Sequence, residues 1–102
     1  DFETATRQKI GITTVILNNG GMATYPVGSA SDFPIARDKS GVGVMTGNYA
    51  DFARSFGAHG IQVTKISELA PALETAKGLN ATGKTVLIDI KTSMVSKRGY
   101  KA

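Results

Sequence analysis

The chain has 102 residues, which allows one domain and is too short for two. Hydrophobic residues account for 41% and charged residues for 20%, proportions that are typical of a globular protein and not of a disordered one. Cysteine is absent, which excludes disulfides, a thiolate nucleophile and a zinc site built on cysteine.

The net charge of +4 raises the question of a nucleic-acid partner. The basic residues are scattered, however, and their one cluster, at residues 97–101, is best explained as a solvated chain end. Aromatic and basic residues are not interleaved as in single-stranded nucleic-acid sites. No apolar run reaches the length of a membrane span, and the start lacks the order of a signal peptide. We therefore expect a cytoplasmic protein with neither a nucleic-acid nor a membrane partner.

A helix and a buried strand are the first predicted elements. Residues 1–10 carry Phe2, Ala5, Thr6 and Lys9 at helical spacing, and Gly11 follows the expected end. Within residues 13–18 the apolar residues follow one another without alternation, which indicates a parallel strand covered on both faces. Ligands of open α/β sheets bind beyond the carboxyl ends of the strands, so the turn after this strand is a candidate site.

Two amides and two glycines form that turn, at residues 18–21. One interpretation is a β-hairpin, because Asn19-Gly20 suits a type I′ turn and residues 22–25 can return as a strand. The other is a metal–diphosphate site, because an asparagine oxygen and a backbone carbonyl are hard ligands suited to Mg²⁺. Glycine also lets the backbone approach a phosphate. The residues by themselves leave both interpretations open.

Residues 22–47 lack periodicity and are predicted to form an irregular connection. Its glycine-rich end, residues 41–47, has the wrong spacing for a dinucleotide fingerprint and is interpreted as a flexible loop.

A short helix is predicted at residues 49–56, with Asn48 as its N-cap and Gly57 in the left-handed C-cap position. Its inward side chains are expected to be Phe52, Ala53 and Phe56. His59, the only histidine, is interpreted as a turn residue and not as a catalytic group.

Strands at residues 61–66 and 85–91 flank a helix that we expect Ser67 to cap. The packed face of this helix is assigned to Leu69, Leu73 and Ala76, and its end to Gly78, Asn80 and Gly83. Helical crossovers require parallel strands with right-handed connections. The predicted fold class is therefore α/β, part of a three-layer α/β/α parallel-sheet fold.

Residues 17–21, Leu-Asn-Asn-Gly-Gly, resemble the closing half of the thiamine-diphosphate motif, which opens with Gly-Asp-Gly and ends with Asn-Asn. Residues 1–7 are similar to the helix before that strand in acetolactate-synthase-like and decarboxylase enzymes. Residues 56–63 and 85–90 resemble later strands of the same domain. The resemblance implies that residues 1–93 are the C-terminal part of a thiamine-diphosphate-binding domain, with residues 94–102 as a loose basic tail.

The resemblance also implies a set of cofactor contacts. Thiamine diphosphate would be bound by Asn19, Gly20, Gly21 and Met22, with the Asn19 side chain and the Gly21 carbonyl as Mg²⁺ ligands. Residues 22–25 would face the thiazolium ring and the substrate. The Gly-Asp-Gly half would precede Asp1, so we expect a fragment that by itself binds the cofactor weakly and is inactive.

The expected parent is a thiamine-diphosphate- and Mg²⁺-dependent lyase or transferase that acts on 2-oxo acids, similar to acetolactate synthase or a decarboxylase. The alternative is a non-catalytic α/β module that serves assembly or binding. Partners are expected to be the remainder of the parent enzyme, or a second copy bound through an exposed sheet edge. The sequence before Asp1 would discriminate between the enzyme and the module.

Overall fold

The computed structural model describes residues 1–21 and 47–92. They belong to two units, residues 1–17 with 48–91, and residues 18–47 with 92–102. The elements in chain order are α1 (Phe2–Arg7), β1 (Thr13–Asn18), α3 (Tyr49–Ser55), β2 (His59–Val63), the 3₁₀ turn η1 (Ile66–Glu68), α4 (Leu69–Ala81) and β3 (Val86–Lys91).

The three described strands form one parallel sheet in the order β1-β3-β2. β2 and β3 are parallel, with His59 opposite Val86. The nitrogen of Val86 donates to the carbonyl of Ile12, and that of Thr92 to the carbonyl of Asn18, both at 2.9 Å. Both hydrogen bonds join residues the same number of positions apart, which is the pattern of a parallel ladder. The predicted parallel α/β fold is thereby confirmed.

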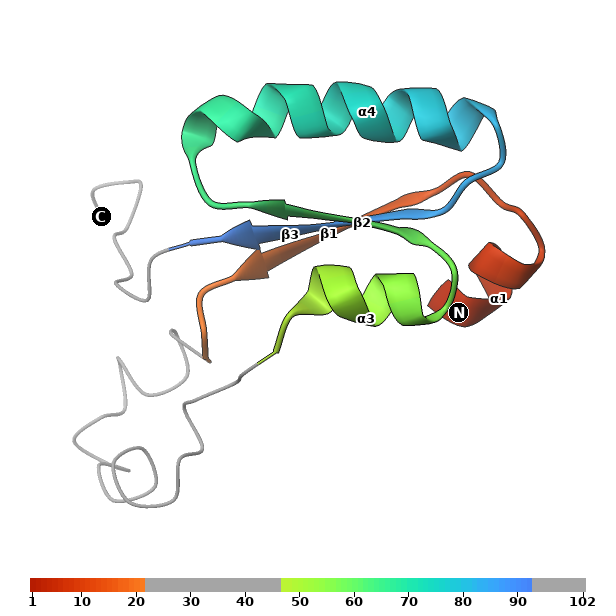
Figure 1. Cartoon of the computed structure of the whole chain (residues 1–102), viewed down its shortest axis with the longest axis horizontal. Helices are drawn as coiled ribbons and strands as arrows, with labels where there is room; N and C mark the ends of the chain where they lie inside the picture. The colour runs from red at the N-terminus through yellow and green to blue at the C-terminus, as the bar shows by residue number, and fades with distance from the viewer. Residues whose placement is uncertain (22–46, 93–102) are drawn as a thin grey trace, which may run out of the picture. The chain divides into compact units, whose positions relative to one another are not determined.

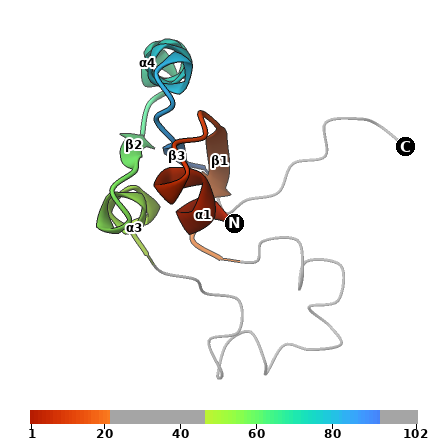
Figure 2. The same cartoon turned by 90° about the vertical axis from the view of Figure 1, so that its right-hand side faces the viewer.

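Helices cover both faces of the sheet (Figure 1). α4 lies over one face and α3 over the other, and Figure 2 shows α1 on the same side as α3. The core under α4 consists of Val63, Ala72, Ala76, Val86 and Ile88. The core on the α3 side consists of Ala53, Ala58 and Leu87, with Phe2, Ile16 and Tyr49 packed against it. Neighbouring residues of β3 therefore enter opposite cores, as expected for a strand covered on both faces.

α1 is shorter than the helix predicted at residues 1–10. Lys9 adopts the left-handed conformation, with φ of 57°. Its nitrogen donates to Thr6 at 3.2 Å, and the nitrogen of Ile10 donates to Ala5 at 2.9 Å. Together these bonds make a Schellman motif, which ends the helix before Gly11. The prediction was wrong here because a lysine occupies the position where glycine usually signals the helix end.

Both predicted caps of α3 are confirmed. The Asn48 side chain accepts a hydrogen bond from the nitrogen of Asp51 at 3.1 Å, which satisfies one of the free N–H groups at the helix start. Gly57 has φ of 82° and follows the helix end. Capping depends on residues next to one another in the chain, and the sequence alone was therefore sufficient.

The predicted inner face of α3 is only partly right. Ala53 is fully buried, whereas Phe52 is 53% and Phe56 is 39% exposed, with their rings edge to face. The close approach of helix and sheet explains the difference: a Cβ on Gly60 would lie 2.1 Å from the Ala50 carbonyl oxygen. At that separation alanines fit between the layers and phenylalanines do not.

β2 begins and ends earlier than the strand predicted at residues 61–66. The nitrogen of His59 donates to the Thr85 carbonyl at 2.9 Å, so His59 is the first strand residue and not a turn residue. The chain leaves the sheet after Val63, and Ile66 lies in η1 with its side chain 86% exposed.

α4 begins at Leu69, after η1, and Ser67 is not its cap. Of the predicted packed face, Ala76 is buried and Leu69 packs against the core, but Leu73 is 46% exposed. The helix continues through Gly78 and Asn80, and only Gly83, with φ of 82°, marks its end. β3 confirms the strand predicted at residues 85–91, except that it begins one residue later, at Val86.

Several predictions concern residues outside the described ranges: the irregular connection at residues 22–47 and its flexible loop at residues 41–47, both apart from Gly47, the return strand or cofactor-facing segment at residues 22–25, and the loose tail at residues 94–102. Within residues 1–21 and 47–92, no helix combines the length and apolar character needed to cross a bilayer.

Candidate functional site

The turn after β1 is held by two side-chain-to-backbone hydrogen bonds. The Asn18 side-chain oxygen accepts from the nitrogen of Gly20 at 3.1 Å, and that of Asn19 accepts from the nitrogen of Gly21 at 3.0 Å. These are two successive Asx turns. Gly20 has φ of 77°, a conformation that glycine adopts without strain. Hydrogen bonds within residues 18–21 therefore stabilise the conformation of this turn.

The oxygens of this turn have the chemistry of magnesium ligands. An amide oxygen carries two lone pairs. The Asn19 side-chain oxygen uses one of them to accept the hydrogen bond from the Gly21 N–H. The backbone carbonyl of Gly21 is a second neutral oxygen in the same turn. Mg²⁺ binds hard oxygens and commonly combines a few protein groups with phosphate and water. The donor set fits Mg²⁺, although residues 18–21 supply no carboxylate.

The structure brings together three of the four predicted cofactor residues, because Asn19, Gly20 and Gly21 share this turn. Met22 lies outside the described residues. The amide of Asn18 was not assigned a role from the sequence. Asn18 is buried, with 8% of the residue exposed, and its side-chain oxygen accepts from the Gly20 N–H, so it stabilises the turn from the buried side.

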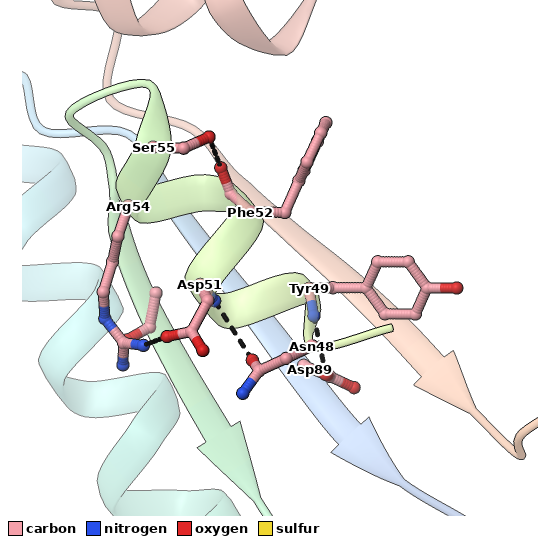
Figure 3. A network of polar contacts seen from close by, with 8 residues as sticks. Asn48, Tyr49, Asp51, Phe52, Arg54, Ser55 and Asp89 are labelled. Carbon is pink, nitrogen blue, oxygen red and sulfur yellow. Dashed lines mark hydrogen bonds and ion pairs between the residues drawn. The ribbon is translucent and has the colours of Figure 1, made fainter. Parts of the chain in front are cut away.

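A second polar cluster joins the end of β3 to the start of α3 (Figure 3). Asp89 has no exposed surface, and its Oδ2 accepts from the nitrogen of Tyr49 at 3.2 Å. The Lys91 ammonium lies 3.8 Å from the same oxygen. A buried carboxylate is retained only where donors surround it. Asp89 thus ties the first residue of α3 to the sheet.

Sequence reasoning missed Asp89 as a structural anchor. The available signal was an acidic residue inside an otherwise apolar run, Val86 to Ile90. Such a residue in a strand covered on both faces must have a buried partner, but the pattern does not say which one.

The other ionisable groups of the described residues form no cluster suited to metal binding. In residues 1–21 and 47–92, no three acidic or histidine side chains are placed to hold a metal ion. His59 is half-buried in β2. The pKa of Glu68 is lowered, chiefly by a hydrogen bond from the Thr64 backbone and further by the Thr64 hydroxyl and the Lys65 backbone. These contacts are structural, at the turn from β2 into η1.

Residues 1–90 match the family model described as "Thiamine pyrophosphate enzyme, C-terminal TPP binding domain". The chain belongs to this family. Thiamine pyrophosphate is thiamine diphosphate under another name, so the match confirms both the resemblance seen in the Asn-Asn-Gly-Gly turn and the cofactor that it implied. The matched region contains the whole turn and every described helix and strand except the last residue of β3.

A relative in Bacillus subtilis (strain 168) bears the name "Putative thiamine pyrophosphate-containing protein YdaP". It is 42% identical to this chain over 78 residues. The aligned region is 74% of this chain but 13% of the relative. The chain therefore spans a small part of that relative's length, and the relative's name again points to thiamine diphosphate.

Proposed function

We propose that residues 18–21 supply the asparagine half of a thiamine diphosphate and Mg²⁺ site in an enzyme that acts on 2-oxo acids. The hydrogen bond between the Asn19 side chain and the Gly21 nitrogen carries the proposal, because it sets both candidate ligand groups in one turn. Family membership supports the cofactor. The resemblance of residues 1–7, 56–63 and 85–90 to acetolactate-synthase-like and decarboxylase enzymes supports the substrate class.

Each residue of the turn has a separate role in this proposal. Asn19 would hold Mg²⁺ through its side-chain oxygen and Gly21 through its carbonyl. Gly20 has no Cβ and adopts a left-handed conformation, so the backbone can approach a diphosphate closely. Asn18 keeps the turn in shape. Thiamine diphosphate, when bound, supplies the stabilisation of the substrate carbanion, while the chain binds and orients.

The two proposed protein ligands are neutral, so a carboxylate from elsewhere is needed for firm Mg²⁺ binding. We therefore expect the isolated 102-residue chain to bind thiamine diphosphate weakly and to leave 2-oxo acids unchanged. The natural protein that contains these residues is the proper subject of the test.

Substitution Asn19→Ala in that protein tests the site. Calorimetric titration with thiamine diphosphate at fixed Mg²⁺ should show a loss of affinity of about 10–100-fold. Asn80→Ala is the matched control: the Asn80 amide donates to the carbonyl of Ile12, just before the start of β1, at 3.0 Å. This control should lose stability and keep its affinity for the cofactor.

Equal affinities for wild type and Asn19→Ala would contradict the proposed site. Release of carbon dioxide from pyruvate and related 2-oxo acids tests the substrate class separately. Cofactor binding without turnover of any 2-oxo acid would favour the alternative, a non-catalytic α/β module.

A further inference from the structure

The strand β2 lies at one end of the strand order, and one of its sides has no neighbouring strand among the described residues. The nitrogen of His59 donates to the Thr85 carbonyl, so His59 turns its backbone groups towards β3. Backbone direction alternates along a parallel strand. The groups that face away from β3 therefore belong to Gly60 and Gln62, and to Thr64 just beyond the strand.

Outward backbone groups on an edge strand are a template for pairing with another chain. At the start of β2 the Gly60 carbonyl is already taken, because Nη2 of Arg54 donates to it at 2.9 Å. The Arg54 guanidinium also forms an ion pair with Asp51, one turn earlier in α3 (Figure 3). The ion pair holds the guanidinium in place, so the Arg54 side chain covers this end of the edge.

At the other end the Thr64 nitrogen donates to Oε1 of Glu68 at 3.0 Å. The same oxygen accepts from the nitrogen of Lys65 at 2.9 Å and from the Thr64 hydroxyl at 3.0 Å. These donors lower the pKa of Glu68, because they bond to the ionised form of the carboxylate. Glu68 thus covers the second end of the edge.

We propose that Arg54 and Glu68 close the outer edge of β2 against pairing with another strand, either an extended peptide or a second copy of this chain. An added strand would have to displace the guanidinium from Gly60 and the carboxylate from Thr64. Between the two occupied groups, only the N–H and the carbonyl of Gln62 remain on the outer side of the strand. Strands are usually three residues or longer, so this remainder is too short for a stable ladder.

The pair Arg54→Met and Glu68→Leu tests this inference in the natural protein, because each change keeps bulk and removes the hydrogen-bonding group. The matched control is Arg7→Met with Glu3→Leu. Those two residues form an exposed ion pair on α1, at 3.0 Å, and do not touch β2. The control therefore removes the same residue types and the same charges.

Sedimentation across a range of concentrations should give the edge variant a weight-average mass that exceeds that of the control and rises towards twice that value with concentration, because paired copies are at minimum dimers. Hydrogen exchange provides a second measurement. The Thr64 amide should exchange faster in the monomeric edge variant than in the control, since its acceptor is gone.

Equal masses for the edge variant and the control, whether both associate or both do not, would overturn the inference. Should the double substitution prevent folding, Arg54→Met by itself keeps the test decisive, because that side chain is 53% exposed. The weight-average mass of the Arg54→Met variant must then exceed that of the Arg7→Met variant, and equal masses would again overturn the inference.

Discussion

Two glycines in the described part of the chain have opposite surroundings. A Cβ on Gly60 would lie 2.1 Å from the carbonyl oxygen of Ala50, a backbone atom that can move only with α3. A Cβ on Gly78, inside α4, would meet nothing within 4 Å. Glycine at position 60 therefore allows α3 to pack closely on β2, whereas glycine at position 78 only lowers the stability of α4.

Alanine at these two positions should change stability in opposite directions. Gly60→Ala should lower the free energy of unfolding by about 1–3 kcal/mol, because the packed layers must separate. Gly78→Ala should raise it by about 0.5–1 kcal/mol, the usual difference between the two residues in a helix interior. Urea denaturation of both variants checks this. A Gly60→Ala variant as stable as wild type would show that α3 is not pressed against β2.

At this scale, the residues predicted correctly from sequence are those that act on near neighbours. Asn48 and Gly57 cap α3 through groups close to them in the chain. Asn19 and Gly21 also meet through a contact between near neighbours, but their roles at a cofactor site stay a prediction. The contact of Asp89 with Tyr49 could not be predicted, because Tyr49 is distant in the chain and becomes its neighbour only in the folded structure.

Among the elements, the boundary between β2 and η1 depends on one carboxylate. Glu68 accepts hydrogen bonds from Thr64 and Lys65, and they lower its pKa below the ordinary value of 4.5. A carboxyl group with a lowered pKa in the folded state binds protons more readily when the chain is unfolded. Its stabilising effect is therefore present above pH 4.5 and is lost as the pH falls through the folded-state pKa.

Glu68→Gln should accordingly lower the melting temperature most at neutral pH. The difference in melting temperature between this variant and wild type should decrease as the pH falls below 4.5. Thermal melting from pH 7 to pH 3 measures this difference. Glu74→Gln, which removes a charge from α4, serves as the control and should run parallel to wild type. A difference that stays constant across this range would contradict the role given to Glu68.

Element types and their order were predictable, and several boundaries were not. The run from Ile61 to Ile66 looks like one strand, but β2 starts at His59 because the first ladder hydrogen bond forms there. The strand ends early because Glu68 draws the following backbone into η1. Both causes are contacts across a turn or a sheet, which an apolar pattern does not record.

At the scale of the whole molecule, the two edges of the described sheet differ. The run from Ile10 to Leu17 contains no charged residue. Within it the side chains of Val15 and Leu17 are 45% and 70% exposed. Charged residues are a common protection of exposed edges, and β1 has none of its own. We expect the β1 edge to be the surface through which the sheet is extended, by another strand of a longer protein or by a second copy.

For the 102-residue chain this predicts self-association that Leu17→Lys abolishes, because a lysine on an edge strand opposes pairing. Ile66→Lys is the matched control, since Ile66 is an exposed apolar residue of η1, away from β1. Light scattering on both variants distinguishes pairing at β1 from non-specific association through exposed apolar residues. Loss of association in both, or in neither, would contradict a specific role for the β1 edge.

The closed edge of β2 also limits how large such an assembly can grow. In the language of polymer chemistry, a unit with one reactive end can only terminate a chain, whereas a unit with two can propagate it. Copies joined through β1 present their β2 edges outwards, where Arg54 and Glu68 occupy the outer backbone groups. Consider a mixture of wild-type protein with a variant that lacks both side chains. A wild-type copy that joins a polymer of the variant through its β1 edge should end the growth of that polymer, so the mean polymer length should fall as the wild-type fraction rises.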